Sequence, residues 1–222
     1  IYFNQYKVQS RNQRIKVKAV KPMVESFDTK QPVAKRNDGL NWKRPKLDYK
    51  EIADVFNKAE TFYSKKDYEN AKKTYINVLT LHPLHPGANN KLGLIYLKEG
   101  RASKAEVIFR KLVEIKPHEA VYYSNLGLAL YSLGHKLEAK QAYTRAIKLD
   151  PKKDSRFLSL GQVCVDLKHW KPAINAFSKA LELNPKNDKL YFYIADLLIK
   201  VQAYNEAMAF MKTYLNMNPY SK

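Results

Sequence analysis

The 222-residue sequence contains a single cysteine, Cys164, so no disulfide can form within the chain. A lone cysteine is typical of proteins that work in a reducing compartment such as the cytosol. The sequence has no run of the roughly 18 apolar residues that a membrane-spanning helix requires. Its seven glycines form no G-x-G-x-x-G motif, the pattern of a phosphate-binding loop. We therefore expect a non-enzymatic cytoplasmic protein that holds neither a cofactor nor a metal ion.

The histidines offer little chemistry. His82 and His85 form an H-x-x-H pattern, which on one helical turn could bind a metal ion. They lie on either side of Pro83, however, and no cysteine or carboxylate cluster accompanies them. We interpret both as residues of a surface turn, and Cys164 as a buried packing thiol rather than a nucleophile.

Acidic residues are scarce at the N-terminal end, where the first 24 residues contain none. Residues 1–47 hold twelve Lys or Arg against three acidic residues, a net charge of +9, and three prolines interrupt any helical period. We predict that this segment is an extended, mostly irregular arm that docks electrostatically on RNA, an anionic membrane or an acidic protein. The predicted docking residues of the arm are Lys7, Arg11, Arg14, Lys16, Lys18, Lys21, Lys35, Arg36, Lys43, Arg44 and Lys46.

The start of the arm supports a second interpretation. Its aromatic residues run directly into Lys and Arg in the stretch IYFNQYKVQSRNQRIKVK. Aromatic residues at the interface and positive charge inside are typical of the cytoplasmic flank of a membrane helix. Such a helix would precede Ile1 and tether the chain to the cytoplasmic face of a membrane.

Proline recurs on a strict count in the rest of the sequence. Five of the ten prolines are spaced by 34 residues, namely Pro83, Pro117, Pro151, Pro185 and Pro219. A fixed period between about 20 and 50 residues indicates stacked structural repeats. Proline removes a backbone donor and clashes with the preceding turn, so it ends a helix. We therefore predict five helical hairpins, each closed by a proline.

Small and large residues also recur when the recurrent proline is numbered position 32 of each unit. Position 8 is Ala or Gly and position 20 is Ala in all five units, whereas position 24 is Tyr, Phe or Met. Two helices approach to about 8–10 Å only where small residues meet, so positions 8 and 20 must lack bulk. Gly100 and Gly134 share position 15, which serves the turn between the two helices.

These residues resemble the tetratricopeptide repeat family, whose pattern has small residues at positions 8 and 20, an aromatic at 24 and proline at 32. The resemblance implies an all-α fold: a helical-hairpin solenoid in a right-handed superhelix, preceded by the extended basic arm. It also implies a non-enzymatic scaffold that binds a peptide or protein segment in a concave groove. The expected solenoid covers residues 48–222, with repeats at approximately 52–85, 86–119, 120–153, 154–187 and 188–222.

In this family the first helix of each repeat lines the groove, mainly through positions 2, 5, 6, 9, 12 and 13. Those positions have an apolar middle with an amide or hydroxyl rim, and two aspartates toward the C-terminal end. The residues that the resemblance places in the groove are Asn90, Lys91, Leu94, Leu97, Lys98, Ser124, Asn125, Leu128, Tyr131, Gln162, Asp166, Phe192 and Asp196.

The last predicted helix is apolar on more than one face, in the stretch AMAFMKTYL. Terminal repeats normally need a polar outer face for solubility. We expect further repeats after Lys222, or a partner, to cover Met208, Phe210, Met211 and Leu215.

The alternative to a groove-binding scaffold is an RNA- or membrane-associated component of a larger assembly. It would be attached through the basic arm, and its binding would depend steeply on salt.

Overall fold

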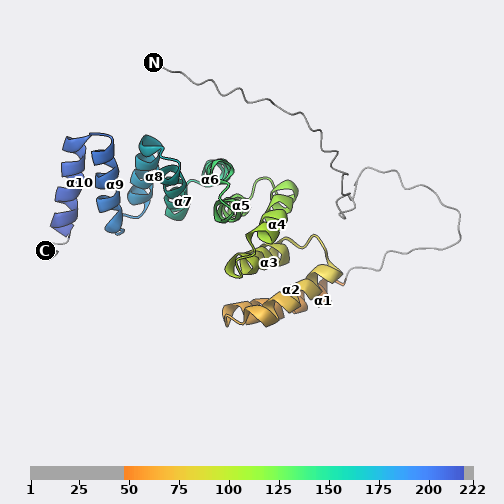
Figure 1. The fold of residues 1–222 in the computed structure, drawn as a ribbon. Coiled ribbons are helices and arrows are strands. Elements are labelled where there is room, and N and C mark those ends of the chain that lie inside the picture. The colour runs from red at the N-terminus through yellow and green to blue at the C-terminus, as the bar shows by residue number, and fades with distance from the viewer. Residues whose placement is uncertain (1–47, 218–222) are drawn as a thin grey trace, which may run out of the picture. The chain divides into compact units, whose positions relative to one another are not determined.

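The computed structural model describes residues 48–217, so the predicted basic arm (1–47) and residues 218–222 lie outside the described part (Figure 1). Residues 48–217 form ten α-helices and contain no β-strand. In chain order they are α1 (Tyr49–Ser64), α2 (Tyr68–Leu81), α3 (Pro86–Lys98), α4 (Ala102–Ile115), α5 (Ala120–Ser132), α6 (Lys136–Leu149), α7 (Asp154–Asp166), α8 (Trp170–Leu183), α9 (Lys189–Lys200) and α10 (Tyr204–Met217). The predicted all-α solenoid is confirmed.

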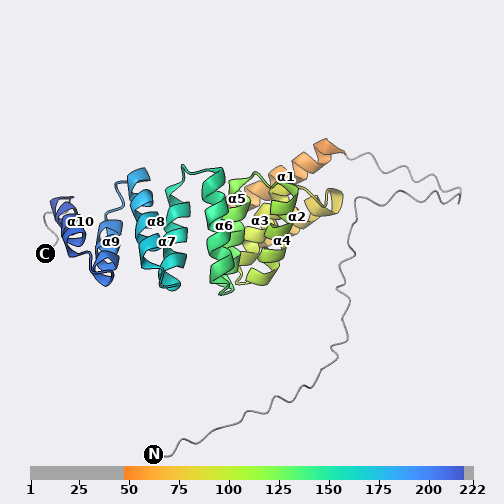
Figure 2. The same ribbon diagram turned by 90° about the horizontal axis from the view of Figure 1, so that it is seen from above.

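The helices pack in the order in which they occur in the sequence. Each helix contacts the next one along the chain, so α1 pairs with α2, α3 with α4, and so on to α9 with α10 (Figure 2). Contacts that skip a helix join α3 to α5 and α5 to α7. The first helices α3, α5 and α7 therefore lie beside one another and form a shared face.

The recurrent prolines end the second helix of each of the first four hairpins, as predicted, whereas the fifth, Pro219, lies outside the described residues. The helices α2, α4, α6 and α8 each end two residues before such a proline. The intervening residue has left the helical region in every case, with φ between −130° and −146° and ψ between 70° and 99°. This follows from the proline ring, which clashes with a helical conformation of the residue before it.

The turn inside each hairpin is built in one way. The residue at position 15 has a left-handed backbone in all five hairpins, with φ between +58° and +80°. The amide of the following residue donates to a carbonyl five residues back, as His135 does to Leu130 (2.9 Å) and His169 to Cys164 (2.8 Å). This pattern satisfies the last carbonyl groups of the first helix. Glycine occupies position 15 at only two of the turns, whereas Lys66, Lys168 and Gln202 occupy it at the others.

The small residue at position 8 is explained by the aromatic residue at position 24 of the same hairpin. A Cβ placed on Gly161 would lie 2.5 Å from Cε1 of Phe177, and one on Gly93 would lie 2.6 Å from Cζ of Phe109. The first helix thus packs its glycine directly on a buried ring of the second. The prediction that small residues meet small residues at position 8 is wrong, because the glycine faces a large ring. The recurrence of a small residue at this position is confirmed.

The core is a chain of clusters rather than one centre. One cluster lies among α1, α2 and α3, a second extends from α3 to α7, and a third extends from α7 to α10. Cys164 is buried in the third cluster, as predicted, and burial raises the pKa of its thiol. Because neighbouring hairpins share each cluster, the alignment of the first helices is fixed by packing along the whole stack.

Candidate functional site

The face formed by α3, α5, α7 and α9, which we call the inner face, carries most of the predicted groove residues. Two hydrogen bonds between predicted groove residues connect its helices directly. Nδ2 of Asn125 donates to Oδ1 of Asn90 (2.7 Å), and the Tyr131 hydroxyl donates to Oδ2 of Asp166 (2.7 Å). Each bond joins residues 35 positions apart, so the polar positions of successive repeats are linked across the inner face.

The predicted groove residues are accessible to different degrees. Those that are exposed are Lys98, Leu128, Gln162, Phe192 and Asp196. Those that are half-buried are Asn90, Lys91, Leu94, Leu97, Ser124, Asn125, Tyr131 and Asp166. Leu94 and Leu97 pack against the second core cluster and contribute less free surface than Leu128 does.

A hollow of about 330 Å³ lies on the inner face between α5 and α7. Its lining residues are Val121, Ser124, Asn125, Leu128, Tyr143, Lys153, Ser155, Arg156 and Ser159. Val121 and Leu128 are each 42% exposed and give the hollow an apolar wall. An apolar wall that the protein's own side chains leave uncovered is typical of a binding surface.

Arg156 fixes the polar side of this hollow. Its Nε donates to the Ser124 hydroxyl (3.0 Å), and its Nη1 bonds both the Asp150 carbonyl (2.7 Å) and the Asp150 carboxylate (2.6 Å). The guanidinium holds the pKa of Asp150 below its usual range. The arginine thus joins α7 to α5 and to the turn before α7. The groove positions of the family did not predict it.

A second hollow of about 390 Å³ lies between α7 and α9. Its lining residues are Leu158, Ser159, Gln162, Phe177, Asn187, Lys189, Leu190 and Tyr193. Ser159 lines both hollows, so they adjoin along α7. Phe192 and Tyr193 on α9 are each 57% exposed and extend the apolar surface toward the C-terminal end.

The two predicted aspartates differ in their surroundings. Asp166 accepts from the Tyr131 hydroxyl and from Gln162 (3.1 Å), and the Lys136 ammonium lies 3.9 Å away. The bond to Asp166, with some burial, raises the pKa of Tyr131. Asp166 therefore has its own partners within the protein. Asp196 is exposed and forms an ion pair with Lys200 one helical turn away (2.7 Å).

The two predicted lysines face the first hairpin. Lys91 forms an ion pair with Glu60 (3.1 Å), and its ammonium lies 4.3 Å from the centre of the Tyr63 ring. Lys98 lies in the same way over Tyr68, at 4.9 Å. Cation–π contacts of this kind hold both lysine side chains against α1 and α2, away from the hollows between α5 and α9.

The histidine pair has a structural part. Nδ1 of His85 accepts a hydrogen bond from the Ala88 amide (3.1 Å) and caps the start of α3. Burial lowers the pKa of His85, and nearby His82 lowers it further. Across residues 48–217, no three His, Cys, Asp or Glu side chains lie close enough together to hold a metal ion. None of the helices in that stretch has the length and apolar character of a membrane span.

The fold and the inner face define the class of the protein, which is a helical-repeat solenoid of the kind that serves as a protein-interaction scaffold. Residues 56–120 and residues 165–220 each match a family model described as tetratricopeptide repeat. Residues 98–180 match a model described as anaphase-promoting complex, cyclosome, subunit 3. The chain belongs to the tetratricopeptide repeat family.

Solved structures agree with this assignment. MamA (41-end) from Desulfovibrio magneticus RS-1 is 26% identical, with 62% of this chain and 77% of that chain covered and a TM-score of 0.58. PilF from Pseudomonas aeruginosa is 24% identical over 75% of this chain and 76% of that one, with a TM-score of 0.64. YrrB, described as a tetratricopeptide repeat protein with an unusual peptide-binding site, is 17% identical over 75% and 86%, with a TM-score of 0.65. No curated protein gave a significant match.

Proposed function

We propose that the protein is a non-enzymatic scaffold whose inner face binds an extended peptide or protein segment. The observation that carries the proposal is the pair of adjoining hollows along α7, which have exposed apolar walls and a fixed polar side. Pockets of this composition suit a chain that anchors apolar side chains and needs partners for its backbone. The peptide-binding site named for YrrB, which shares the fold, supports the same use.

Polar groups on the inner face are available for the backbone of such a peptide. The bond between Asn125 and Asn90 uses one donor and one acceptor, which leaves Nδ2 of Asn90 and Oδ1 of Asn125 without a partner in the described part of the chain. Each amide side chain has two donors and one acceptor oxygen. The pair can therefore meet one carbonyl and one amide of an extended ligand while its own bond stays intact.

A substitution at the wall of the first hollow tests the proposal. Leu128→Lys places a charge where we expect an apolar anchor of the ligand. We expect the variant to keep its helicity and to lose its partner in affinity capture from a nuclease-treated native lysate. Val107→Lys is the matched control, because Val107 is 69% exposed on α4, outside the inner face. If a folded Leu128→Lys protein captures the same partner as the control, the inner face does not bind it.

The basic arm is the second part of the proposal. Its net charge of +9 over residues 1–47 supports electrostatic docking of the scaffold on RNA, an anionic membrane or an acidic protein. A chain attached mainly through the arm should lose binding steeply as salt rises, because released counterions drive such association. Deletion of residues 1–47 should then abolish attachment, whereas Leu128→Lys should leave it unchanged. A flat salt dependence would exclude the arm as the main attachment.

The C-terminal end offers another place for a partner. Met208, Leu215 and Met217 on α10 are each between 46% and 52% exposed, whereas Phe210 and Met211 pack partly against the third core cluster. We propose that further repeats or a partner protein cover this surface. Each Å² of apolar area buried by such a contact would contribute about 25 cal/mol of favourable free energy.

A cytoplasmic location, with or without a membrane tether, is also part of the proposal and agrees with the single buried cysteine.

A further inference from the structure

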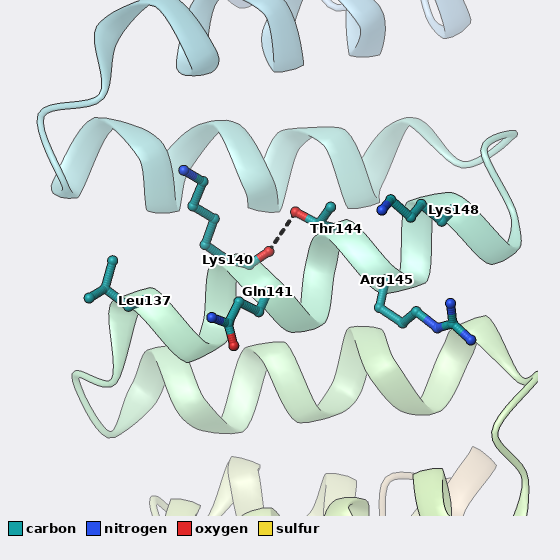
Figure 3. A pocket seen from close by; sticks show the side chains of 6 residues that line it. All are labelled: Leu137, Lys140, Gln141, Thr144, Arg145 and Lys148. Carbon is teal, nitrogen blue, oxygen red and sulfur yellow. Dashed lines mark hydrogen bonds between the residues drawn. The ribbon is translucent and has the colours of Figure 1, made fainter.

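The outward side of α6 carries a hollow of about 420 Å³, separate from those of the inner face (Figure 3). All of its lining residues come from this one helix: Leu137, Lys140, Gln141, Thr144, Arg145 and Lys148. Figure 3 shows Lys140 and Lys148 on one side of the helix axis and Arg145 on the other. We call Lys140, Arg145 and Lys148 the α6 cations.

The α6 cations have no counter-ion in residues 48–217. Residues 120–153 contain six Lys or Arg but only two carboxylates, Glu138 and Asp150. Both carboxylates are already paired, Glu138 with Arg110 (2.6 Å) and Asp150 with Arg156 (2.6 Å). The positive charge on this side of α6 is therefore not compensated by the repeat that carries it.

The contacts that two of the α6 cations do make are with aromatic rings rather than with carboxylates. Nζ of Lys140 lies 3.3 Å from Nδ1 of His169. The guanidinium carbon of Arg145 lies 5.9 Å from the centre of the Tyr123 ring. Such contacts position the side chains without neutralising them, so the full charges remain available to an anion that approaches from solvent.

The other second helices show that the fold itself does not require these cations. The α6 cations occupy positions 21, 26 and 29 of their repeat. The same positions hold Glu106, Lys111 and Glu114 on α4. On α8, position 26 is Lys179, and its ammonium is paired with Glu182 at position 29 (2.5 Å). A carboxylate thus stands at position 29 of both neighbours, and only α6 combines three cations there.

We propose that the outward side of α6 is a second docking surface, which binds an acidic peptide segment of a partner protein. Lys140 and Lys148 are eight residues apart, or about 12 Å along the helix at 1.5 Å per residue. An extended peptide covers that distance in about four residues at roughly 3.3 Å each, so carboxylates on alternate residues match the three cations. Leu137 is 62% exposed at one end and offers a contact for an apolar residue beside the acidic run.

The lining of the hollow favours a peptide over a nucleic acid. Single-stranded nucleic acids are held mainly by stacking of bases on exposed aromatic rings, together with basic groups. None of the six lining residues is aromatic. Gln141 and Thr144 supply hydrogen-bonding groups between the cations, and the Thr144 hydroxyl already donates to the Lys140 carbonyl (2.8 Å).

The test uses the full chain and a fluorescein-labelled peptide in which glutamates alternate with serines after a leucine that carries a photo-crosslinker. Fluorescence anisotropy would compare the unchanged protein with the variant Lys140→Gln, Arg145→Gln and Lys148→Gln. The control variant is Lys73→Gln, Lys179→Gln and Lys212→Gln, which removes the same charge from exposed positions on other second helices. Exposed ion pairs contribute a factor of about two to five each, so we expect affinity to fall about tenfold in the α6 variant and less than twofold in the control.

Location is the second measurement. Mass spectrometry of the crosslinked complex should place the peptide on α6, beside Leu137, rather than on the basic arm. Equal losses in both variants, or crosslinks confined to residues 1–47, would overturn the proposal. It would also be overturned if single-stranded RNA or phosphatidylserine vesicles showed the α6 dependence and the acidic peptide did not. Circular dichroism spectra of the two variants should match, because glutamine is as good a helix former as lysine.

Discussion

The left-handed residue at position 15 of each hairpin gives a prediction that separates backbone strain from packing. A Cβ on Gly134, where φ is +80°, would meet no atom within 4 Å. Gly134→Ala therefore creates no clash, and its cost is conformational. An L-residue in this region loses about 1–2 kcal/mol, and the smaller entropy of the unfolded chain returns about 0.4–1 kcal/mol. We expect Gly134→Ala to destabilise the protein by about 1 kcal/mol, the difference between the two.

The reverse change should stabilise the protein by the same reasoning. Lys168 has φ of +58° and is exposed, and it forms no ion pair within residues 48–217. Lys168→Gly should thus raise the free energy of unfolding by up to about 1 kcal/mol, measured as a shift of the urea midpoint at equilibrium. Lys168→Ala is the control, because alanine retains the backbone strain, and we expect it within about 0.5 kcal/mol of the unchanged protein. If the glycine variant is no more stable than the alanine variant, backbone strain at this turn is negligible and the reasoning is refuted.

Three further predictions concern buried groups. Gly161→Ala should lower stability by about 1–2 kcal/mol despite its better helix propensity, because the new Cβ meets the Phe177 ring. In a protein that already carries Phe177→Leu, the same change should cost much less, as a double-mutant cycle would measure. His85 caps α3 in its neutral form and has a lowered pKa. Its contribution to the free energy of unfolding should therefore be complete above about pH 6.5 and should be lost as pH falls from there through the lowered pKa. His85→Asn should remove this pH dependence from the urea midpoint. Cys164, buried and with a raised pKa, should react with iodoacetamide at pH 8 only after denaturant is added, and fast labelling of the folded protein would contradict its placement.

Much of the solenoid could be predicted from the sequence because its signals are local. The proline spacing located the ends of α2, α4, α6 and α8, since proline restricts the residue before it wherever it occurs. The turn at position 15 was only partly visible, because Gly100 and Gly134 mark it whereas Lys66, Lys168 and Gln202 do not. There the hydrogen bonds of the helix end impose the left-handed backbone on residues that disfavour it. The residue type at position 15 therefore does not reveal the left-handed backbone at these three turns.

The site was less visible than the fold, because it depends on which side chains meet across repeats. Leu128 and Gln162 could be placed on the inner face by their position in the repeat. Arg156 could not be predicted as a site residue, because its role depends on bonds to Ser124 and Asp150 that no repeat position specifies. A spacing of six residues between Asp150 and Arg156 across a helix start is the one signal that a sequence offers for that pair.

The strictly sequential contacts of the ten helices bear on how the chain is made. Because each hairpin within residues 48–217 packs against its neighbours in the sequence, almost every contact between these helices joins residues less than about two repeats apart, and such topologies fold fast. During synthesis at about 5–20 residues per second, each 34-residue unit takes a few seconds to emerge. A hairpin can thus pack against the preceding one while the next is still being translated. Little apolar surface of the nascent chain is then exposed to solvent at any time.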